Sequence, residues 1–251
     1  LHRIEAQPAL FASHPSRRAL QQLTTLEVDA EPVVVNVWRN HAFEPLQSLV
    51  EIYVAYFGWK IEFRLSDYDD SLMYTGHAPA RLELIWLDST RYQHNDQADW
   101  LLWLEDRISE LRQISNAPIV IATWTSSPER QTAIETLAAR IADTHFADLN
   151  LVAEEHDLEL VDTRTAEIAG TQVRGAIQPP VARKLACQWL PAALFPPIKA
   201  LALDLDNTLH KGVLGEDGLH GVYLSPEHRQ LQTFIRNLQS AGLLISLVSR
   251  N

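Results

Sequence analysis

The chain has 251 residues, of which 46% are apolar and 21% charged, and its formal net charge at neutral pH is −11. These values are typical of a globular protein with one large domain or two smaller ones. They exclude a membrane protein, because no run of about 18 apolar residues occurs, and non-specific nucleic-acid binding, which needs clustered Lys and Arg. The single Cys187 excludes an intramolecular disulfide and, with no secretory signal visible at the N-terminus, predicts a cytoplasmic protein.

The first two thirds of the chain are predicted to form a doubly wound parallel α/β fold. Residues 1–30 are expected to be mainly helical, with one apolar helix face over 17–26. Strand and helix patterns then alternate, which favours parallel strands with crossover helices. The predicted strands are 33–38, 60–64, 81–87, 118–123 and 158–162. The predicted helices are 44–57, 96–114 and 129–147.

Two polar features lie within this α/β part. Residues 66–72 read SDYDDSL, and we interpret them as a solvated loop whose Asp and Ser cap a helix. Other polar residues follow the predicted strands, where a cleft would lie at the switch point of the sheet. These strand-end residues are Asn36, Arg39, Asn40, Thr125 and Ser126.

A domain boundary is predicted near residue 195. Residues 181–194 form an expected helix that contains Cys187, and Pro196-Pro197 then interrupts the chain. We therefore divide the chain into domains 1–195 and 196–251. A lone cysteine on an apolar helix face favours a small buried side chain over a reactive thiol.

The stretch that dominates the second domain is the apolar run 198–205, which is typical of a buried parallel strand. It ends in Asp204 and Asp206, whose alternation allows both carboxylates to face one side. Two converging carboxylates repel each other unless a cation lies between them, and Mg²⁺ suits such oxygen ligands. Thr208 adds a hydroxyl two residues further on. The pattern therefore predicts a magnesium site at the carboxyl end of this strand.

The remaining elements place one more polar side chain at the same edge. Residues 209–223 are Gly-rich and predict a turn and flap beside the strand. A helix over 226–241, with Leu231, Phe234, Ile235 and Leu238 inside, precedes a second parallel strand over 243–248. Ser249 follows that strand, one β-α unit after the two acids.

The stretch DLDNTLHKGVLGEDG, residues 204–218, resembles motif I of the haloacid dehalogenase (HAD) superfamily, and within it the FkbH-like branch of subfamily IIIC. The usual form is DxDNTLWGGVxGEDG, so His210 replaces a Trp and Lys211 a Gly. The resemblance implies that Asp204 is the nucleophile and Asp206 the general acid/base, with Mg²⁺ bound between them. Ser249 resembles motif II, although Arg250 stands where the family usually has Lys. The resemblance also implies substrate-binding roles, which fall on Asn207, Thr208 and Asn251.

The first domain is similar to the SGNH-like N-terminal domain of FkbH-like proteins, including the segment YDDSL. It lacks a Gly-Asp-Ser block after the first strand and an Asp-x-x-His block near its end. Asn150 and Asp162 lie where related domains carry Asn and Asp. We expect a structural or carrier-binding role rather than esterase activity.

The resemblance implies a glyceryl transferase/phosphatase. Such an enzyme removes phosphate from 1,3-bisphosphoglycerate and loads the glyceryl unit onto an acyl carrier protein in polyketide-type biosynthesis. In such enzymes the acyl group is thought to pass through a thiol, for which Cys187 is the sole candidate here. The alternatives are a HAD phosphatase acting on a small phosphoester, and a non-catalytic scaffold that recruits the carrier.

The HAD resemblance also implies parts that the sequence does not show. A motif III Lys or Arg and a motif IV acidic pair are expected in a HAD enzyme, and neither follows Asp206 in recognisable form. Two strands alone would make an unstable sheet. We therefore expect domain 196–251 to be the N-terminal part of a HAD-like domain, incomplete for a full catalytic cycle.

Overall fold

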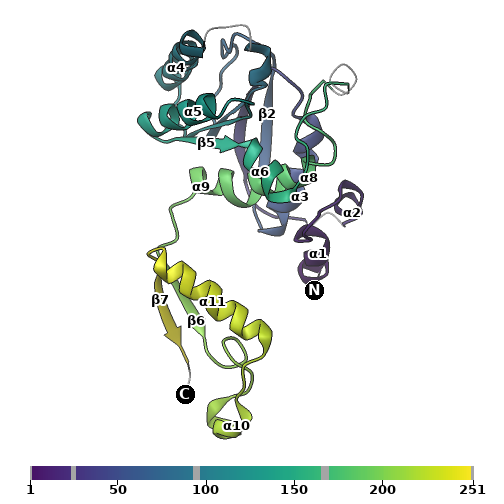
Figure 1. Cartoon of the computed structure of the whole chain (residues 1–251), viewed down its shortest axis with the longest axis vertical. Helices are drawn as coiled ribbons and strands as arrows, with labels where there is room; N and C mark the ends of the chain where they lie inside the picture. The colour runs from purple at the N-terminus through teal and green to yellow at the C-terminus, as the bar shows by residue number, and fades with distance from the viewer. Residues whose placement is uncertain (1, 24–26, 93–96, 165–169, 250–251) are drawn as a thin grey trace. The chain divides into compact units, whose positions relative to one another are not determined.

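The computed structural model describes residues 2–23, 27–92, 97–164 and 170–249. The chain divides into two compact units, Leu1–Phe195 (unit 1) and Pro196–Asn251 (unit 2) (Figure 1). Each unit has its own sheet, with five strands in unit 1 and two in unit 2. No helix in the described ranges is long and apolar enough to cross a bilayer.

Unit 1 is built on a parallel sheet with the strand order β2-β1-β3-β4-β5. Its strands are β1 (Pro32–Arg39), β2 (Lys60–Tyr68), β3 (Leu82–Trp86), β4 (Ile119–Thr123) and β5 (Thr144–Asp148). The order reverses between β1 and β3, so the switch point of this doubly wound sheet lies there. The predicted parallel α/β fold is confirmed.

Helices cover both faces of this sheet. They are α1 (His2–Leu10), α2 (Arg17–Gln21), α3 (Glu44–Tyr56), α4 (Gln97–Ile114), α5 (Pro128–Arg140), α6 (Leu149–His156), α8 (Gln178–Lys184) and α9 (Leu190–Leu194). A 3₁₀ turn, η1 (Ser89–Tyr92), follows β3, and a π-helical turn, η2 (Leu185–Trp189), joins α8 to α9. Alternating residues of β3 show the two faces: Leu84 and Trp86 pack in one buried cluster and Ile85 in the other.

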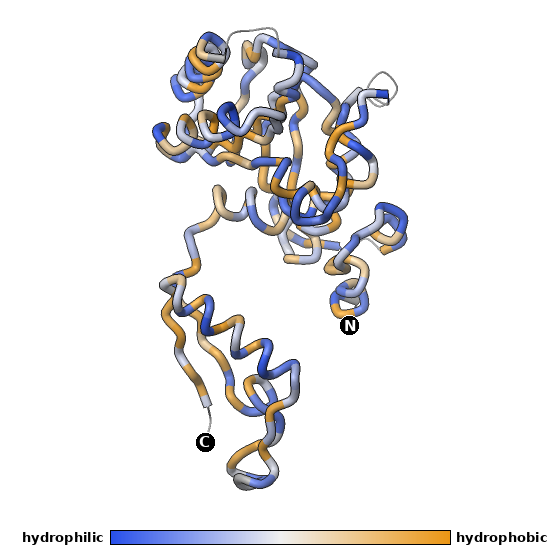
Figure 2. The backbone as a smooth tube through the Cα atoms, viewed as in Figure 1, coloured by the Kyte–Doolittle hydropathy of each residue, from blue (hydrophilic) through white to orange (hydrophobic). Residues whose placement is uncertain are grey.

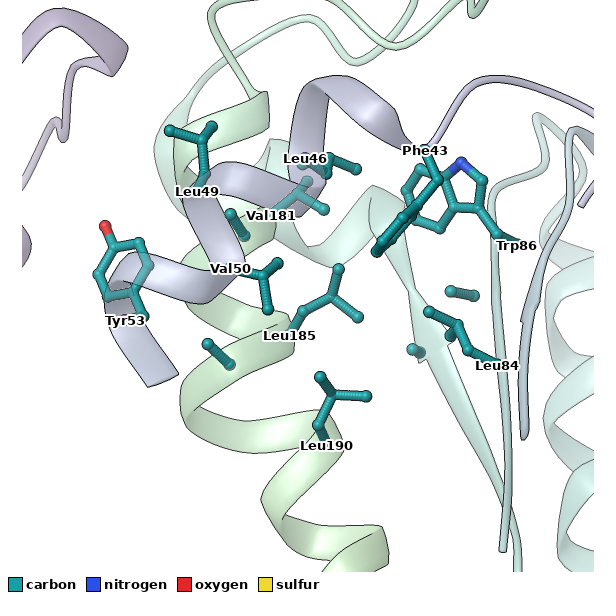
Figure 3. Close-up of a cluster of buried hydrophobic side chains, with 14 of the residues drawn as sticks. Phe43, Leu46, Leu49, Val50, Tyr53, Leu84, Trp86, Val181, Leu185 and Leu190 are labelled. Atoms are coloured by element: carbon teal, nitrogen blue, oxygen red, sulfur yellow. The ribbon is translucent and has the colours of Figure 1, made fainter. Parts of the chain in front are cut away.

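The larger cluster forms where α3 and the α8–α9 segment meet the sheet (Figure 3). Apolar residues recur on α3 at helical spacing, which turns one face of the helix toward the core. These buried residues of α3 are Leu46, Leu49, Val50, Tyr53 and Val54. Gly58 follows the helix at φ +82°, a conformation that glycine adopts without steric cost. Helix α3 thereby ends at Tyr56, and three residues separate it from the start of β2.

The prediction was wrong over residues 129–162. The helix expected over 129–147 ends at Arg140, and 144–148 form β5 instead. The strand expected over 158–162 is absent from the described chain, where Val161 makes only an isolated bridge to Val173. The physical reason is tertiary: β5 pairs with β4 along its whole length, and that pairing overrides a weak helical pattern.

Three smaller corrections concern element ends. Strand β2 continues to Tyr68, so Ser66 and Asp67 belong to the strand and cap no helix. Asp69 accepts the backbone amides of Ser71 and Met73 at 2.7 and 2.8 Å, which closes a turn rather than a helix. In the segment 17–26, helix α2 ends at Gln21, and residues 24–26 lie outside the described ranges.

Unit 2 has two parallel strands, β6 (Ala200–Asp204) and β7 (Leu244–Val248). The short helix α10 (Leu214–Gly221) and the longer α11 (Pro226–Ser240) lie between them in sequence. Ser225 caps α11 in a capping box with His228, and Pro226 occupies its first turn. Polar and apolar residues alternate along α11 (Figure 2). Its apolar face is narrower than predicted, because Ile235 is buried whereas Phe234 is 59% exposed.

Candidate functional site

The carboxyl ends of β6 and β7 bring the predicted phosphoryl-binding residues to one edge. Asp204 is the last residue of β6, and its Cα partner in the register is Val248, the last residue of β7. Ser249 follows Val248 directly, so it lies beside the residues that follow Asp204. Asp204 is exposed, and Asp206 and Ser249 are half-buried. Asn251 lies outside the described residues.

The chain turns tightly after Asp206. Leu205 accepts the backbone amides of Thr208 and Leu209, and Asp206 forms a parallel bridge with His210. Asn207 has φ +56°, a left-handed conformation that Asn tolerates better than most residues. Its side-chain oxygen accepts the amide of Gly212 at 3.0 Å. Asn207 therefore shapes this turn, and its role in substrate binding stays a prediction, as does that of the half-buried Thr208.

Three consecutive amides of the following loop are held by side chains of the same stretch. Asn207 accepts from Gly212, Asp217 accepts from Val213 at 2.8 Å, and Asp206 accepts from Leu214 at 3.5 Å. Leu214 is the first residue of α10, so Asp206 contacts the start of that helix. The start of the predicted flap, residues 212–214, is therefore hydrogen-bonded to Asn207, Asp217 and the predicted catalytic residue Asp206.

The two departures from the FkbH-like pattern lie at the same base. His210 Nε2 is 3.9 Å from Asp206 Oδ1, and the His210 side chain is 18% exposed. Lys211 is exposed, and its backbone exchanges two hydrogen bonds with Tyr223 at 2.9 and 3.1 Å. These bonds close the loop 211–223 into a hairpin-like neck. The His210 side chain thus lies near Asp206, whereas the backbone of Lys211 supports the loop.

The donor set fits a magnesium ion in part. Asp204 and Asp206 supply two carboxylates at a strand end, and no group of three or more His, Cys, Asp or Glu with metal-binding geometry occurs in the described ranges. Mg²⁺ commonly keeps several waters and takes one or two protein carboxylates together with substrate phosphate oxygens. The carboxylates of Asp204 and Asp206, beside the predicted phosphate-binding edge, are consistent with this mode of Mg²⁺ coordination.

Cys187, the possible acyl thiol, lies in η2 of unit 1 and is half-buried against the larger core cluster. Burial raises the pKa of its thiol to about 11, although the positive charge of Arg183 opposes the shift. Because the thiolate is the nucleophile, this environment disfavours an acyl-carrying role.

Alkylation provides the test of this environment. At pH 7.5, a thiol with a pKa of about 11 has roughly 300-fold less thiolate than a free cysteine with a pKa of about 8.5. We expect iodoacetamide to modify Cys187 at least about tenfold more slowly in the folded protein than in urea, as followed by mass spectrometry. Equal rates in the two conditions would contradict the buried thiol.

At the carboxyl edge of the unit 1 sheet, the strand-end residues are largely sealed. Asn40 is fully buried, donates to the Asp88 carbonyl at 3.2 Å and accepts the Asp88 amide at 2.7 Å. Arg39 donates to the Ser66 carbonyl and pairs with Glu44. Of the five residues expected to line a cleft here, only Ser126 is exposed. The switch point is therefore filled by a structural hydrogen-bond network.

Unit 1 also has two cavities. One of about 280 Å³ lies at the carboxyl ends of β1 and β2 and is lined by Arg39, Ser66 and the β2–β3 connection. A larger, mainly apolar cavity of about 880 Å³ lies between α1, α3 and the amino end of β2. Because parallel sheets place their chemistry at the carboxyl ends of strands, the larger cavity is not the natural catalytic position.

His41, which sequence reasoning missed, follows β1 and is fully buried. Its Nδ1 lies 2.8 Å from the Thr171 hydroxyl, its ring stacks on Trp86, and its edge meets Trp124. Burial, together with the charges of Arg91 and Arg39, holds the His41 pKa well below its usual range. The imidazole is therefore neutral in the fold at neutral pH.

Acid should destabilise unit 1 through His41. The unfolded chain takes up a proton at this residue below about pH 6.5, and the folded chain does not, so stability falls as the pH drops below that value. We expect His41→Gln to reduce the loss between pH 6.5 and 5.5 by about 1 kcal/mol. Urea unfolding followed by tryptophan fluorescence reports on unit 1, because all seven Trp residues precede residue 190. An unchanged pH slope would contradict this role.

Glu83, on β3, is a second buried polar residue that the sequence pattern concealed. Its carboxylate is fully buried and meets four side chains. They are Trp38 at 2.7 Å, Ser115 at 2.7 Å, His77 at 3.0 Å and Asn36 at 3.4 Å. Asn36 is thus part of a satisfied internal network rather than of a cleft. The RLELIWL run reads as apolar with one polar interruption, which gives no sign of these partners.

A comparison with known proteins finds a solved structure of similar fold. No family model and no curated protein sequence matches the chain. One similar solved structure is the N-terminal part of the protein BF1531 from Bacteroides fragilis, described as containing a phosphatase domain complexed with Mg. The match has a TM-score of 0.56 and 16% sequence identity, and it covers 93% of this chain and 72% of that one. At this identity the likeness establishes a shared fold.

Proposed function

We propose that the chain belongs to a magnesium-dependent enzyme that removes a phosphoryl group from a small phosphorylated substrate. The observation that carries the proposal is the shared edge of β6 and β7, where Asp204 and Asp206 meet the strand that leads to Ser249. The similar structure from Bacteroides fragilis, described as containing a phosphatase domain with Mg, supports the same reading. The sequence resemblance to HAD motif I supports it independently.

The proposed chemistry assigns one role to each side chain. An oxygen of Asp204 attacks phosphorus, and the bond between phosphorus and the leaving oxygen breaks while Asp206 donates a proton to that oxygen. Asp206 then takes a proton from the water that hydrolyses the aspartyl phosphate. Ser249 donates a hydrogen bond to a phosphoryl oxygen. Asp204 and Asp206 would hold Mg²⁺, which when bound would screen the negative charge that otherwise repels the substrate.

The finer form of the proposal is a cytoplasmic glyceryl transferase. Its substrate would be 1,3-bisphosphoglycerate, and its acceptor the thiol of an acyl carrier protein that unit 1 recruits. The carrier thiolate would attack the C1 carbonyl and expel the C1 phosphate, and Asp204 would take the phosphoryl group from the C3 oxygen. The FkbH-like stretch 204–218 is the support for this form. The raised pKa of Cys187 favours direct acceptance by the carrier thiol over an enzyme thioester. The raised pKa of Cys187 is equally compatible with the simpler alternative, a phosphatase that acts on a small phosphoester and needs no thiol.

One experiment separates these forms. The full-length protein is incubated with Mg²⁺ and 1,3-bisphosphoglycerate, with and without a carrier protein, while phosphate release and carrier mass are measured. Carrier-dependent phosphate release with a matching mass gain is the expected result. Phosphate release without acylation would identify the phosphatase. Carrier binding without magnesium-dependent release would identify the scaffold and overturn the enzymatic proposal.

A further inference from the structure

His210 carries a buried polar atom that the fold itself does not explain. Its Nδ1 is buried, and no hydrogen-bond partner for it occurs in the described part of the chain. Leaving a buried nitrogen unpaired costs free energy, and such groups in folded proteins usually reflect a functional constraint. His41 also has a buried ring nitrogen without a partner, Nε2, but its Nδ1 meets the Thr171 hydroxyl at 2.8 Å and its ring stacks on Trp86.

The other ring nitrogen of His210 lies near Asp206. Nε2 lies 3.9 Å from Asp206 Oδ1, and the backbone bridge between the two residues fixes them side by side. The amide of Leu214 reaches the same Oδ1 at 3.5 Å. The Leu214 contact is at the limit of a hydrogen bond, and the His210 contact is longer than one. Contacts at catalytic groups often tighten only when substrate binds. Two groups, one from each side of the loop, therefore approach one oxygen of Asp206.

The loop that carries His210 is itself anchored. Gln232 of α11 donates to the Leu209 carbonyl at 2.7 Å, and the backbone of Lys211 pairs with Tyr223. The residues on either side of His210 are thus fixed by contacts that do not involve the imidazole. The ring is presented to Asp206 by a rigid support, as a residue that orients a reactive group must be.

We propose that His210 is a positioning residue for Asp206. Its Nε2 and the Leu214 amide hold Oδ1, which fixes the direction of the carboxylate at the carboxyl end of β6. The inference rests on the proposed function, in which Asp206 exchanges protons with the leaving group and with water. A misdirected Asp206 carboxylate would slow this proton exchange and leave substrate binding intact. Loss of His210 should therefore lower kcat and leave KM nearly unchanged.

Three variants of the full-length protein test this role. His210→Phe keeps a ring of similar size without nitrogen, and His210→Gln keeps a nitrogen at the ε position. His220→Phe is the matched control, because His220 is exposed on α10. Turnover of p-nitrophenyl phosphate is measured at saturating Mg²⁺, and magnesium affinity is measured separately by calorimetry. Circular dichroism melting verifies that each variant is folded.

We expect His210→Phe to lower kcat about tenfold with KM changed by less than about twofold, and to weaken magnesium binding about tenfold, the size of loss usual for supporting residues. His210→Gln should stay within about threefold of the wild type in both measurements. Equal losses in the Phe and Gln variants, or unchanged kcat and magnesium affinity in His210→Phe, would overturn the inference.

The proposed function is tested separately by Asp204→Asn. If that variant is inactive and His210→Phe is unimpaired, only the positioning role is wrong. If the wild type neither binds Mg²⁺ nor turns over the probe, or if Asp204→Asn stays fully active, the proposed function fails and the role of His210 fails with it.

Discussion

Replacing Asp204 with Asn is expected to lower kcat on the order of 10⁴-fold, the scale seen when a nucleophile that acts with a partner is removed. Asn is nearly isosteric with Asp, so β6 and its pairing with β7 should persist. The amide nitrogen, however, cannot attack phosphorus, and the remaining oxygen carries no formal charge. The loss should therefore appear in turnover and not in folding.

The measurement is phosphate release by the full-length protein over a range of Mg²⁺ concentrations. Glu227→Gln is the matched control, because it also removes one negative charge from unit 2 and Glu227 is exposed at the start of α11. The control should retain wild-type activity. Undiminished activity in Asp204→Asn, with a folded protein, would contradict the assignment of the nucleophile.

The second large effect is expected at Gly212, where the flap narrows to a neck. Gly212 has φ +95°, and a Cβ added there would lie 2.5 Å from the Gly221 carbonyl oxygen. Gly212→Ala should destabilise the loop by about 3 kcal/mol, since it combines an unfavourable φ with a clash against backbone. Hydrogen exchange of peptides covering 205–225 should then be about a hundredfold faster, because each 1.4 kcal/mol corresponds to a tenfold change.

Gly218→Ala is the matched control for this prediction. Gly218 also has a positive φ, of +63°, but no atom lies within 4 Å of a Cβ added there. Its ψ of −175° places it in a region essentially confined to glycine, so its substitution should cost only the backbone term, about 1 to 2 kcal/mol. The difference between the two variants isolates the contact between Gly212 and Gly221. Equal exchange rates in the two variants would show that the neck contact does not stabilise the flap.

The strand and helix positions were predicted correctly where a clear apolar pattern extends over a whole element. Strands β1, β3 and β4 are mainly apolar runs bounded by turns, and helix α3 has its buried residues at regular spacing. The prediction failed at β5, whose sequence THFAD has a mixed pattern and becomes a strand only through pairing with β4. Phe234 shows the same limit in unit 2, because which side of α11 is covered depends on what packs against it.

The candidate site was also only partly predictable from the sequence. Asp204 and Asp206 were identified because two acids directly after an apolar strand form a pattern that is contained in a few contiguous residues. The sequence analysis did not predict three features of the site. They are the hydrogen bond from the Val213 amide to Asp217, the close approach of Gly212 to Gly221, and the contact of His210 with Asp206. These features depend on backbone turns and side-chain directions, which sequence spacing alone does not fix.

The sequence by itself determined where β1 to β4 lie along the chain, the apolar face of α3 and the position of the acid pair. These follow from periodicity and residue type within short windows. The tertiary structure decided that Asn40 and Asp88 bond to each other at the unit 1 switch point and that His41 and Glu83 are buried. It also decided that His210 and the Leu214 amide lie near Asp206. Each of these depends on which distant residue fills the space around a polar group, and only the folded chain sets that.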